Sequence, residues 1–123
     1  MNIREAATLS DILAPYEHGT GVRGVMRPDA VFVRRLGVMG CELQLHADDP
    51  RISIPAYEST TVDTAGVGDT HIATMCAALL LGHDFVEAAR MANAAAAITI
   101  SHESALPVPS WEQIREVMKN GRV

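Results

Sequence analysis

The chain has 123 residues and is 48% hydrophobic, so it is long enough for one domain with a buried core and too short for two ordinary domains. Its formal net charge is −5 and it has no block of Lys or Arg, which argues against nucleic acid as the main partner. No apolar run approaches the ~18 residues of a membrane span, and the N-terminus lacks the apolar core of a secretory signal. Cys41 and Cys76 lack a C-x-x-C spacing, as expected for reduced thiols in the cytoplasm.

The first thirty residues contain one predicted helix and one glycine pattern. Apolar residues recur at helical spacing over residues 2–13, and Asn2 could cap this helix in a variant of the capping box, with Glu5 at the third position. Residues 19–24 fit G-x-G-x-x-G, the fingerprint of dinucleotide-binding folds. Because a turn precedes the pattern and Pro28 soon follows, where that fold needs a strand and a helix, we interpret the segment as a loop.

A β-hairpin is predicted next. Residues 30–35 are β-branched and mostly apolar, and residues 41–46 alternate between apolar and polar, so we expect both to be strands. Gly37 and Gly40 lie in the turn that joins them. A third, short strand is expected over residues 51–56, where it ends near a proline.

The most informative stretch is residues 62–71, where Gly66 and Gly68 are flanked by aspartates. It leads into a predicted helix over residues 70–81. Glycines let the backbone take positive φ and approach a ligand closely, and a turn before a helix points several N–H groups at one place, where the helix dipole adds positive charge. The stretch predicts an anion-binding cradle with the Asp69 carboxylate beside it as a base. The alternative is a tight turn with Asp69 as the helix N-cap.

The C-terminal third is predicted to be helical. Asp84 could cap a helix over residues 85–100, and the alanines on all sides of this helix indicate close packing against its neighbours, which we expect to include a sheet. Asn93 is the polar residue in the middle of the helix, and on the residues alone it is a hydrogen-bonded core asparagine. Ser110 caps a last amphipathic helix that ends at Gly121.

The stretch at residues 63–70, Asp-Thr-Ala-Gly-Val-Gly-Asp-Thr, resembles D-T-x-G-A-G-D, the C-terminal signature of the ribokinase (PfkB-type) carbohydrate kinases. Two shorter motifs agree with it in order and spacing: residues 2–5 are similar to the family's N-x-x-E, and residues 36–40 to its G-x-x-G loop beside ATP. The resemblance covers nearly the whole chain. It implies an α/β, ribokinase-like fold with a mainly parallel sheet flanked by helices, in a single domain over residues 1–123.

The resemblance implies ATP-dependent transfer of a phosphoryl group to a hydroxyl of a sugar or sugar-like substrate, with Mg²⁺ and, at a second site, a monovalent cation such as K⁺. No G-x-x-x-x-G-K-[ST] motif is present, so backbone N–H groups are expected to hold the γ-phosphate. The residues assigned in this way are Asp69 as general base; Ala65, Gly66, Val67 and Gly68 as the anion cradle; Asn2, Glu5, Gly37, Gly40 and Asn93 at the nucleotide, with Asn93 on a helix alongside the adenine pocket; Glu5 near Mg²⁺ through water; and Asp63 as either a cation ligand or a turn-forming Asx residue.

Three residues depart from the family's pattern. Arg35 stands where many members carry Thr, so we assign no hydroxyl contact there. Ser104 replaces a glycine in a loop whose carbonyls help to hold the monovalent cation in the family. His71 takes a position that is usually apolar or aromatic, and we interpret it as a structural histidine.

Family members are well over twice as long as this sequence, and their N-terminal half carries a di-glycine motif, most sugar contacts and a β lid. The chain therefore resembles the C-terminal, nucleotide-binding portion of such a kinase. Two other functions stay open: a non-catalytic nucleotide-binding or interaction module, and part of a nucleoside kinase. Without the preceding strands a sheet edge or an apolar face should be uncovered, so we expect a dimer or a higher oligomer.

Overall fold

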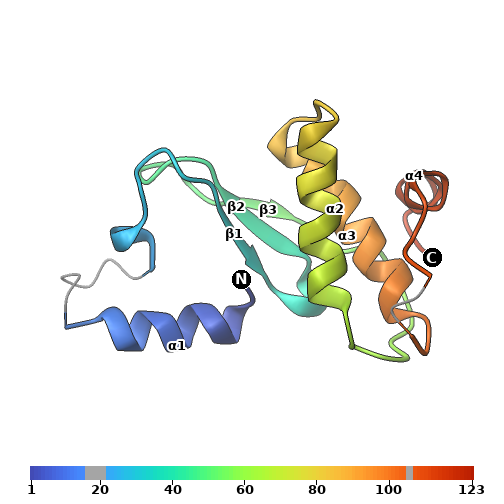
Figure 1. The fold of residues 1–123 in the computed structure, drawn as a ribbon, viewed down its shortest axis with the longest axis horizontal. Coiled ribbons are helices and arrows are strands. Elements are labelled where there is room, and N and C mark those ends of the chain that lie inside the picture. Colours follow the sequence, from blue (N-terminus) through green and yellow to red (C-terminus); the bar gives the residue numbers. More distant parts are fainter. Residues whose placement is uncertain (16–21, 105–106) are drawn as a thin grey trace. The chain divides into compact units, whose positions relative to one another are not determined.

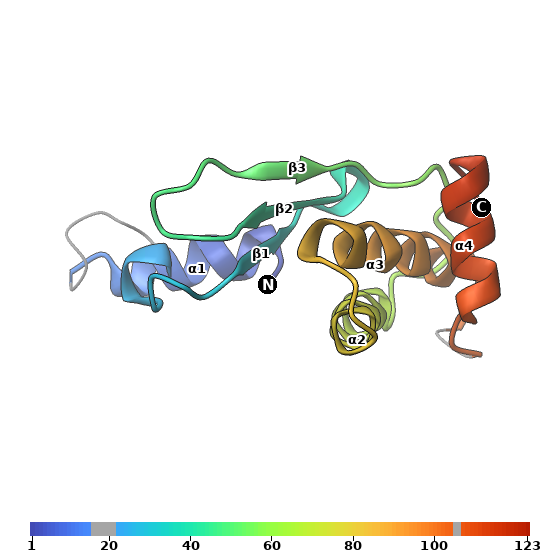
Figure 2. The ribbon, with the colours of Figure 1, turned by 90° about the horizontal axis from the view of Figure 1, so that it is seen from above.

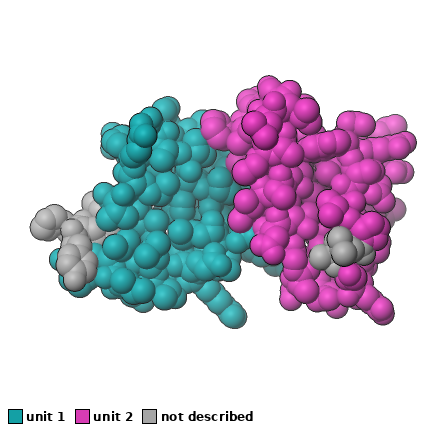
Figure 3. Space-filling view, viewed as in Figure 1, with its two compact units in different colours: residues 1–53 teal, residues 54–123 magenta. Residues whose placement is uncertain are grey.

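The computed structural model describes residues 1–15, 22–104 and 107–123 (Figure 1). The chain divides into two compact units, residues 1–53 and 54–123 (Figure 3). The single domain expected from the sequence stays a prediction. No helix in the described residues is long and apolar enough to cross a membrane.

In chain order the elements are helix α1 (Ile3–Leu13), the short 3₁₀ helix η1 (Val22–Val25), strand β1 (Phe32–Arg35), the 3₁₀ turn η2 (Gly37–Met39), strands β2 (Cys41–Gln44) and β3 (Ile52–Ile54), and helices α2 (Val67–Leu80), α3 (Phe85–Ile100) and α4 (Trp111–Asn120).

The first unit is built around a three-stranded sheet of order β1-β2-β3, and the unit ends within β3. β1 and β2 form the predicted antiparallel hairpin, in register from the pair Phe32–Gln44 to the pair Arg35–Cys41. Both strands are shorter than predicted at their outer ends. Because side chains alternate along a strand, Arg34 lies on the same face as Phe32, and Arg35 lies on the opposite face.

Helix α1 begins with the predicted capping box. Asn2 Oδ1 accepts a hydrogen bond from the Glu5 N–H at 2.8 Å, and Glu5 Oε2 accepts one from the Asn2 N–H at 2.7 Å. Just before the helix, Met1 O accepts the Arg35 N–H at 2.8 Å, and Asn2 forms a parallel bridge with Arg35. The start of α1 is therefore tied to the end of β1. The buried side chains of Ala6, Val22 and Phe32 form a small core in this unit.

The glycine segments of the first unit form turns. Gly37 and Gly40 have φ angles of 62° and 93°, a region that favours glycine, and the Leu36 N–H donates to Gly40 O at 2.8 Å. These features close the hairpin. Of the pattern at residues 19–24, positions 19–21 lie outside the described residues. The remainder falls in η1, a 3₁₀ helix of 4 residues where a dinucleotide-binding fold would begin a long helix.

Helices make up most of the second unit. α2 packs along α3, and α4 also packs against α3 (Figure 2). Small side chains allow helix axes to approach closely, and the predicted burial of the alanine-rich helix is confirmed. Outside the helices, Glu58 forms a parallel bridge with Arg122. The fully or nearly fully buried alanines of α3 are Ala88, Ala89, Ala92, Ala94, Ala95 and Ala97.

The caps predicted for α3 and α4 are confirmed. Asp84 Oδ1 accepts the Glu87 N–H at 2.8 Å, and Ser110 forms a capping box with Gln113. The last of these helices ends at Gly121, with a φ of 78°. Each cap satisfies backbone groups that a helix end would otherwise leave without partners.

Helix α2 begins earlier than predicted. Its N-cap is Gly66, in the left-handed conformation, and not Asp69, which lies in the first turn of the helix. Gly82, with a φ of 93°, follows the C-terminus as predicted. One side of α2 is exposed and largely apolar, and spacings of three, four and seven residues place its members on a common face. These exposed residues are Asp69, Ile72, Ala73, Cys76 and Leu80.

Candidate active site

The glycine motif of the second unit forms a tight turn that leads directly into α2. Asp63 Oδ1 accepts the Ala65 N–H at 2.9 Å, which is the hydrogen bond of an Asx turn. Gly66 follows with a φ of 73° and a ψ of −2°, a conformation that costs an L side chain about 1–2 kcal/mol. The sequence left two roles open for Asp63, and the structure shows the turn-forming one.

The turn leaves several backbone donors without a partner. Within the described residues, the N–H groups of Gly66, Gly68 and Asp69 donate no hydrogen bond, and the Val67 N–H reaches Thr64 O only at 3.4 Å. The first N–H groups of a helix have no partner inside the helix, and together with its dipole they favour an anion. Since the Ala65 N–H already donates to Asp63, it would have to be shared with any anion in this turn.

The motif is held against the end of α3. Ile100 O accepts hydrogen bonds from the Val62 N–H at 2.8 Å and from the Asp63 N–H at 3.2 Å. A carbonyl in the last turn of a helix has no partner within that helix, so these bonds satisfy it. They also fix the point from which the Asx turn starts. The Asp69 side chain is exposed in the first turn of α2, on the same side of the helix as Ile72.

His71 and Asn93 form a buried polar connection between α2 and α3. His71 Nε2 lies 3.0 Å from Asn93 Oδ1, and the Asn93 amide nitrogen donates to Ile54 O and Pro55 O, each at 3.0 Å. Since both amide hydrogens are used by carbonyls, the amide oxygen is the acceptor, and His71 Nε2 carries the hydrogen. His71 is a structural histidine, as predicted. Asn93 is the hydrogen-bonded core asparagine, one of the two roles considered for it.

The other predicted nucleotide-binding residues lie in the first unit. Asn2 and Glu5 use their side chains in the capping box of α1, while Gly37 and Gly40 shape the hairpin turn. The structure thus places Asn2, Glu5 and the end of β1 together in one unit. It places the Asx turn, the glycines of α2 and Asp69 together in the other.

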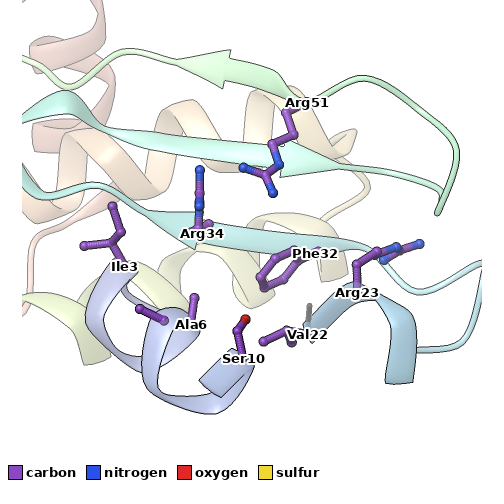
Figure 4. A pocket seen from close by; sticks show the side chains of 9 residues that line it. Ile3, Ala6, Ser10, Val22, Arg23, Phe32, Arg34 and Arg51 are labelled. Atoms are coloured by element: carbon purple, nitrogen blue, oxygen red, sulfur yellow. The ribbon is translucent and has the colours of Figure 1, made fainter. Parts of the chain in front are cut away.

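A small pocket of about 170 Å³ in the first unit was not predicted from the sequence (Figure 4). Arg34 donates to Glu42 Oε2 from Nη2 at 2.6 Å and from Nε at 3.2 Å, and Arg51 reaches the same oxygen at 3.5 Å. Arg34 and Glu42 are cross-strand partners, so the hairpin register could have revealed this pair. The pocket is lined by Ile3, Ala6, Ala7, Ser10, Val22, Arg23, Phe32, Arg34 and Arg51.

The described residues contain no group of three or more His, Cys, Asp or Glu side chains that could hold a metal ion by themselves. Mg²⁺ at a nucleotide usually takes one or two carboxylates, several waters and phosphate oxygens. The Glu5 side chain is 56% exposed, so it fits such a role through water. The loop with Ser104 that would complete a monovalent-cation site continues into residues 105–106, which lie outside the described residues.

The geometry defines part of an α/β fold in which a glycine turn presents backbone donors at the start of a helix, with a carboxylate beside them. The family model of the pfkB family carbohydrate kinases matches residues 3–112, and the chain belongs to this family. Over 79 residues the chain is 39% identical to the bifunctional protein HldE of Bradyrhizobium sp. (strain ORS 278). That match covers 64% of this chain and 16% of HldE.

Solved structures confirm the ribokinase-like fold. The nucleoside kinase of Methanocaldococcus jannaschii, an archaeal member of the ribokinase family, matches with a TM-score of 0.81 and 22% identity over 98% of this chain and 38% of that one. The ribokinase of Arabidopsis thaliana, complexed with ribose and ATP, matches with a TM-score of 0.67 and 27% identity over 72% of this chain and 29% of that one. The chain therefore spans well under half the length of these proteins.

Proposed function

We propose that the protein binds ATP and acts in the transfer of its γ-phosphate to a hydroxyl of a sugar or sugar-like substrate. The observation that carries the proposal is the turn before α2, where the unpartnered N–H groups of Gly66, Gly68 and Asp69 lie beside the exposed Asp69 carboxylate. Membership of the pfkB family and the likeness to a ribokinase with ribose and ATP support it. A nucleoside as acceptor is the second candidate, supported by the likeness to a nucleoside kinase.

The chemistry asks two things of these residues. Phosphoryl transfer depends mainly on positioning and on stabilising the charge of the equatorial oxygens, which backbone N–H groups at a helix start can do. The cradle of residues 65–68, with its helix dipole, would hold those oxygens. Asp69 would accept the proton of the acceptor hydroxyl as its oxygen attacks, while the Asx turn of Asp63 keeps the cradle in shape.

Further parts of the proposal concern the cations and the other unit. Mg²⁺, the metal partner of ATP, would be organised by Asn2 and Glu5 through water. Gly37 and Gly40 would border the nucleotide. A monovalent cation such as K⁺ could bind near Asp63. We place the protein in the cytoplasm, where ATP is available.

The cradle is tested by Gly68→Ala. Gly68 lies inside α2 without a positive φ, so the added methyl group should maintain or slightly raise helix stability, since Ala is the better helix former by about 0.8–1.0 kcal/mol. The same methyl group would crowd an anion held by the N–H groups. We expect the Kd for Mg-ATP, measured by isothermal titration calorimetry, to rise about tenfold, the effect of losing one charged hydrogen bond.

Gly66→Ala is the comparison that separates crowding of the anion from backbone strain. At a φ of 73° the new side chain should destabilise the turn by about 1–2 kcal/mol, so the melting temperature should fall in this variant and not in Gly68→Ala. If Gly68→Ala binds Mg-ATP as tightly as the unaltered chain, the turn is not the phosphate site. Binding without phosphoryl transfer to any sugar or nucleoside would identify a non-catalytic nucleotide-binding module instead.

We also propose that the chain self-associates through the exposed apolar face of α2. Ile72 is 49% exposed and Leu80 is 88% exposed, and apolar faces of this kind often mark interaction surfaces. Light scattering should show a dimer or a higher oligomer, and the double variant Ile72→Glu, Leu80→Glu should be monomeric. Val38→Glu changes an equally exposed apolar residue of the hairpin turn and should leave the oligomer intact. A monomer for the unaltered chain would overturn the proposal.

A further inference from the structure

Arg35 lies at the end of β1, where three features of the first unit meet. Its N–H donates to Met1 O, its backbone forms the bridge with Asn2, and the glycine turn of Gly37 follows almost at once. The Arg35 side chain is only 16% exposed. It lies on the face of the hairpin opposite Arg34, by the alternation of the strand.

The guanidinium of Arg35 is poorly satisfied. Its Nη2 lies 3.7 Å from Glu5 Oε2, beyond hydrogen-bond distance, and that oxygen already accepts the Asn2 N–H at 2.7 Å. Arg35 Nε is buried and has no hydrogen-bond partner among the residues that the structure describes. Buried donors nearly always have a partner, and a charged one without a partner costs the full free energy of its desolvation.

The charge of Arg35 also acts on the amino group of Met1. Burial lowers the pKa of the Met1 ammonium group, and the nearby Arg35 guanidinium lowers this pKa further, against a smaller opposite effect of Glu5. Glu5 itself is more than half exposed, so solvent weakens its compensation of the guanidinium.

By contrast, Arg34 is paired with a carboxylate at hydrogen-bond distance. Its Nε and Nη2 both donate to Glu42, and its side chain lines the pocket on the other face of the hairpin (Figure 4). Two arginines that are neighbours in sequence thus differ in one respect. Arg34 donates from Nε to a carboxylate, whereas the buried Nε of Arg35 has no hydrogen-bond partner among the described residues.

We infer that Arg35 binds the polyphosphate chain of the nucleotide. The phosphate oxygens would supply the hydrogen-bond acceptor that its guanidinium lacks. The inference rests on the proposed function for the identity of the anion. A guanidinium presents a planar fork of donors that suits phosphate oxygens. Here the fork lies beside Asn2 and Glu5, so the phosphates would bind next to the carboxylate assigned to Mg²⁺.

The test compares Arg35→Met with Arg34→Met, because Met keeps an unbranched apolar stem and removes only the charged head. Calorimetric titrations with Mg-ATP, adenosine and inorganic tripolyphosphate measure the three affinities. For Arg35→Met we expect the Kd for Mg-ATP and for tripolyphosphate to rise about 10- to 100-fold, the range for a charged hydrogen bond, with the Kd for adenosine unchanged. Arg34→Met should bind all three as the unaltered chain does.

Thermal unfolding gives a second readout. If Arg35 stabilises the fold by pairing with Glu5, the Arg35→Met variant should have a lower melting temperature. If the guanidinium is a buried charge whose partner is a bound anion, Arg35→Met should melt at the same or a higher temperature. Equal weakening of Mg-ATP and adenosine, or no weakening of either, would overturn the inference. If the unaltered chain binds tripolyphosphate through Arg35 but binds neither Mg-ATP nor adenosine, the anion site stands and the proposed function fails.

Discussion

The Asp69→Asn variant is expected to lose about 10²- to 10⁴-fold in the rate of phosphoryl transfer, the usual effect of removing a general base. Asn keeps the size of the side chain and can still lie in the first turn of α2, but it cannot accept the proton of the attacking hydroxyl. The Kd for Mg-ATP should change little, because the backbone N–H groups of the turn are unaltered. The rate is measured as ADP release from ATP in the presence of a panel of sugars and nucleosides.

Glu112→Gln is the matched control for this experiment. Glu112 is the acidic residue in the first turn of α4, so the substitution removes one negative charge from a corresponding position of another helix in the same unit. It should alter neither the rate nor the Kd. A comparable loss of rate and of Mg-ATP affinity in Asp69→Asn would show that the carboxylate supports the site as a whole, and Asp69 would then not be the base.

The second large effect is expected for Asn93→Leu. Asn93 is 4% exposed, and its loss leaves Ile54 O, Pro55 O and His71 Nε2 without this partner inside the second unit. Ile54 O and His71 Nε2 lie in buried hydrogen bonds, and each costs about 1–3 kcal/mol when unsatisfied, so the free energy of unfolding should fall by at least about 2 kcal/mol. Urea unfolding followed by circular dichroism measures this difference.

Asn120→Leu makes the same substitution at an exposed position at the end of α4 and should change the free energy of unfolding by less than about 0.5 kcal/mol. If Asn93→Leu is as stable as this control, the polar connection between α2 and α3 contributes little to the fold. A double-mutant cycle with His71→Leu would then measure the coupling between the two side chains directly.

The helices and the hairpin could be predicted from local signals. Asp84 and Ser110 are strong capping residues, and Gly37 and Gly40 need positive φ, so these boundaries depend on residues close in the sequence. The start of α2 was predicted too late because glycine and aspartate are poor formers of helix interiors. The left-handed Gly66 lets the helix begin inside the glycine motif, and local propensity did not reveal this.

The contacts of the candidate site depended on tertiary structure to different degrees. The Asx turn joins residues two apart and could be anticipated from the Asp63 side chain. The hydrogen bond between His71 and Asn93 joins residues 22 apart, and nothing in the spacing of the two indicated it. For Arg35, the sequence showed a departure from the family's pattern, but only the structure shows that its Nε lacks a hydrogen-bond partner in the described chain.

The exposed side of α2 also carries a natural position for a spectroscopic reporter. Cys76 is exposed in the single chain, whereas Cys41 is completely buried, so a maleimide fluorophore should react selectively with Cys76 in the monomeric double variant Ile72→Glu, Leu80→Glu. Seven residues along a helix span about 10 Å and return to nearly the same side, which places such a dye close to Asp69. Fluorescence of the labelled double variant could thus follow occupation of the turn before α2.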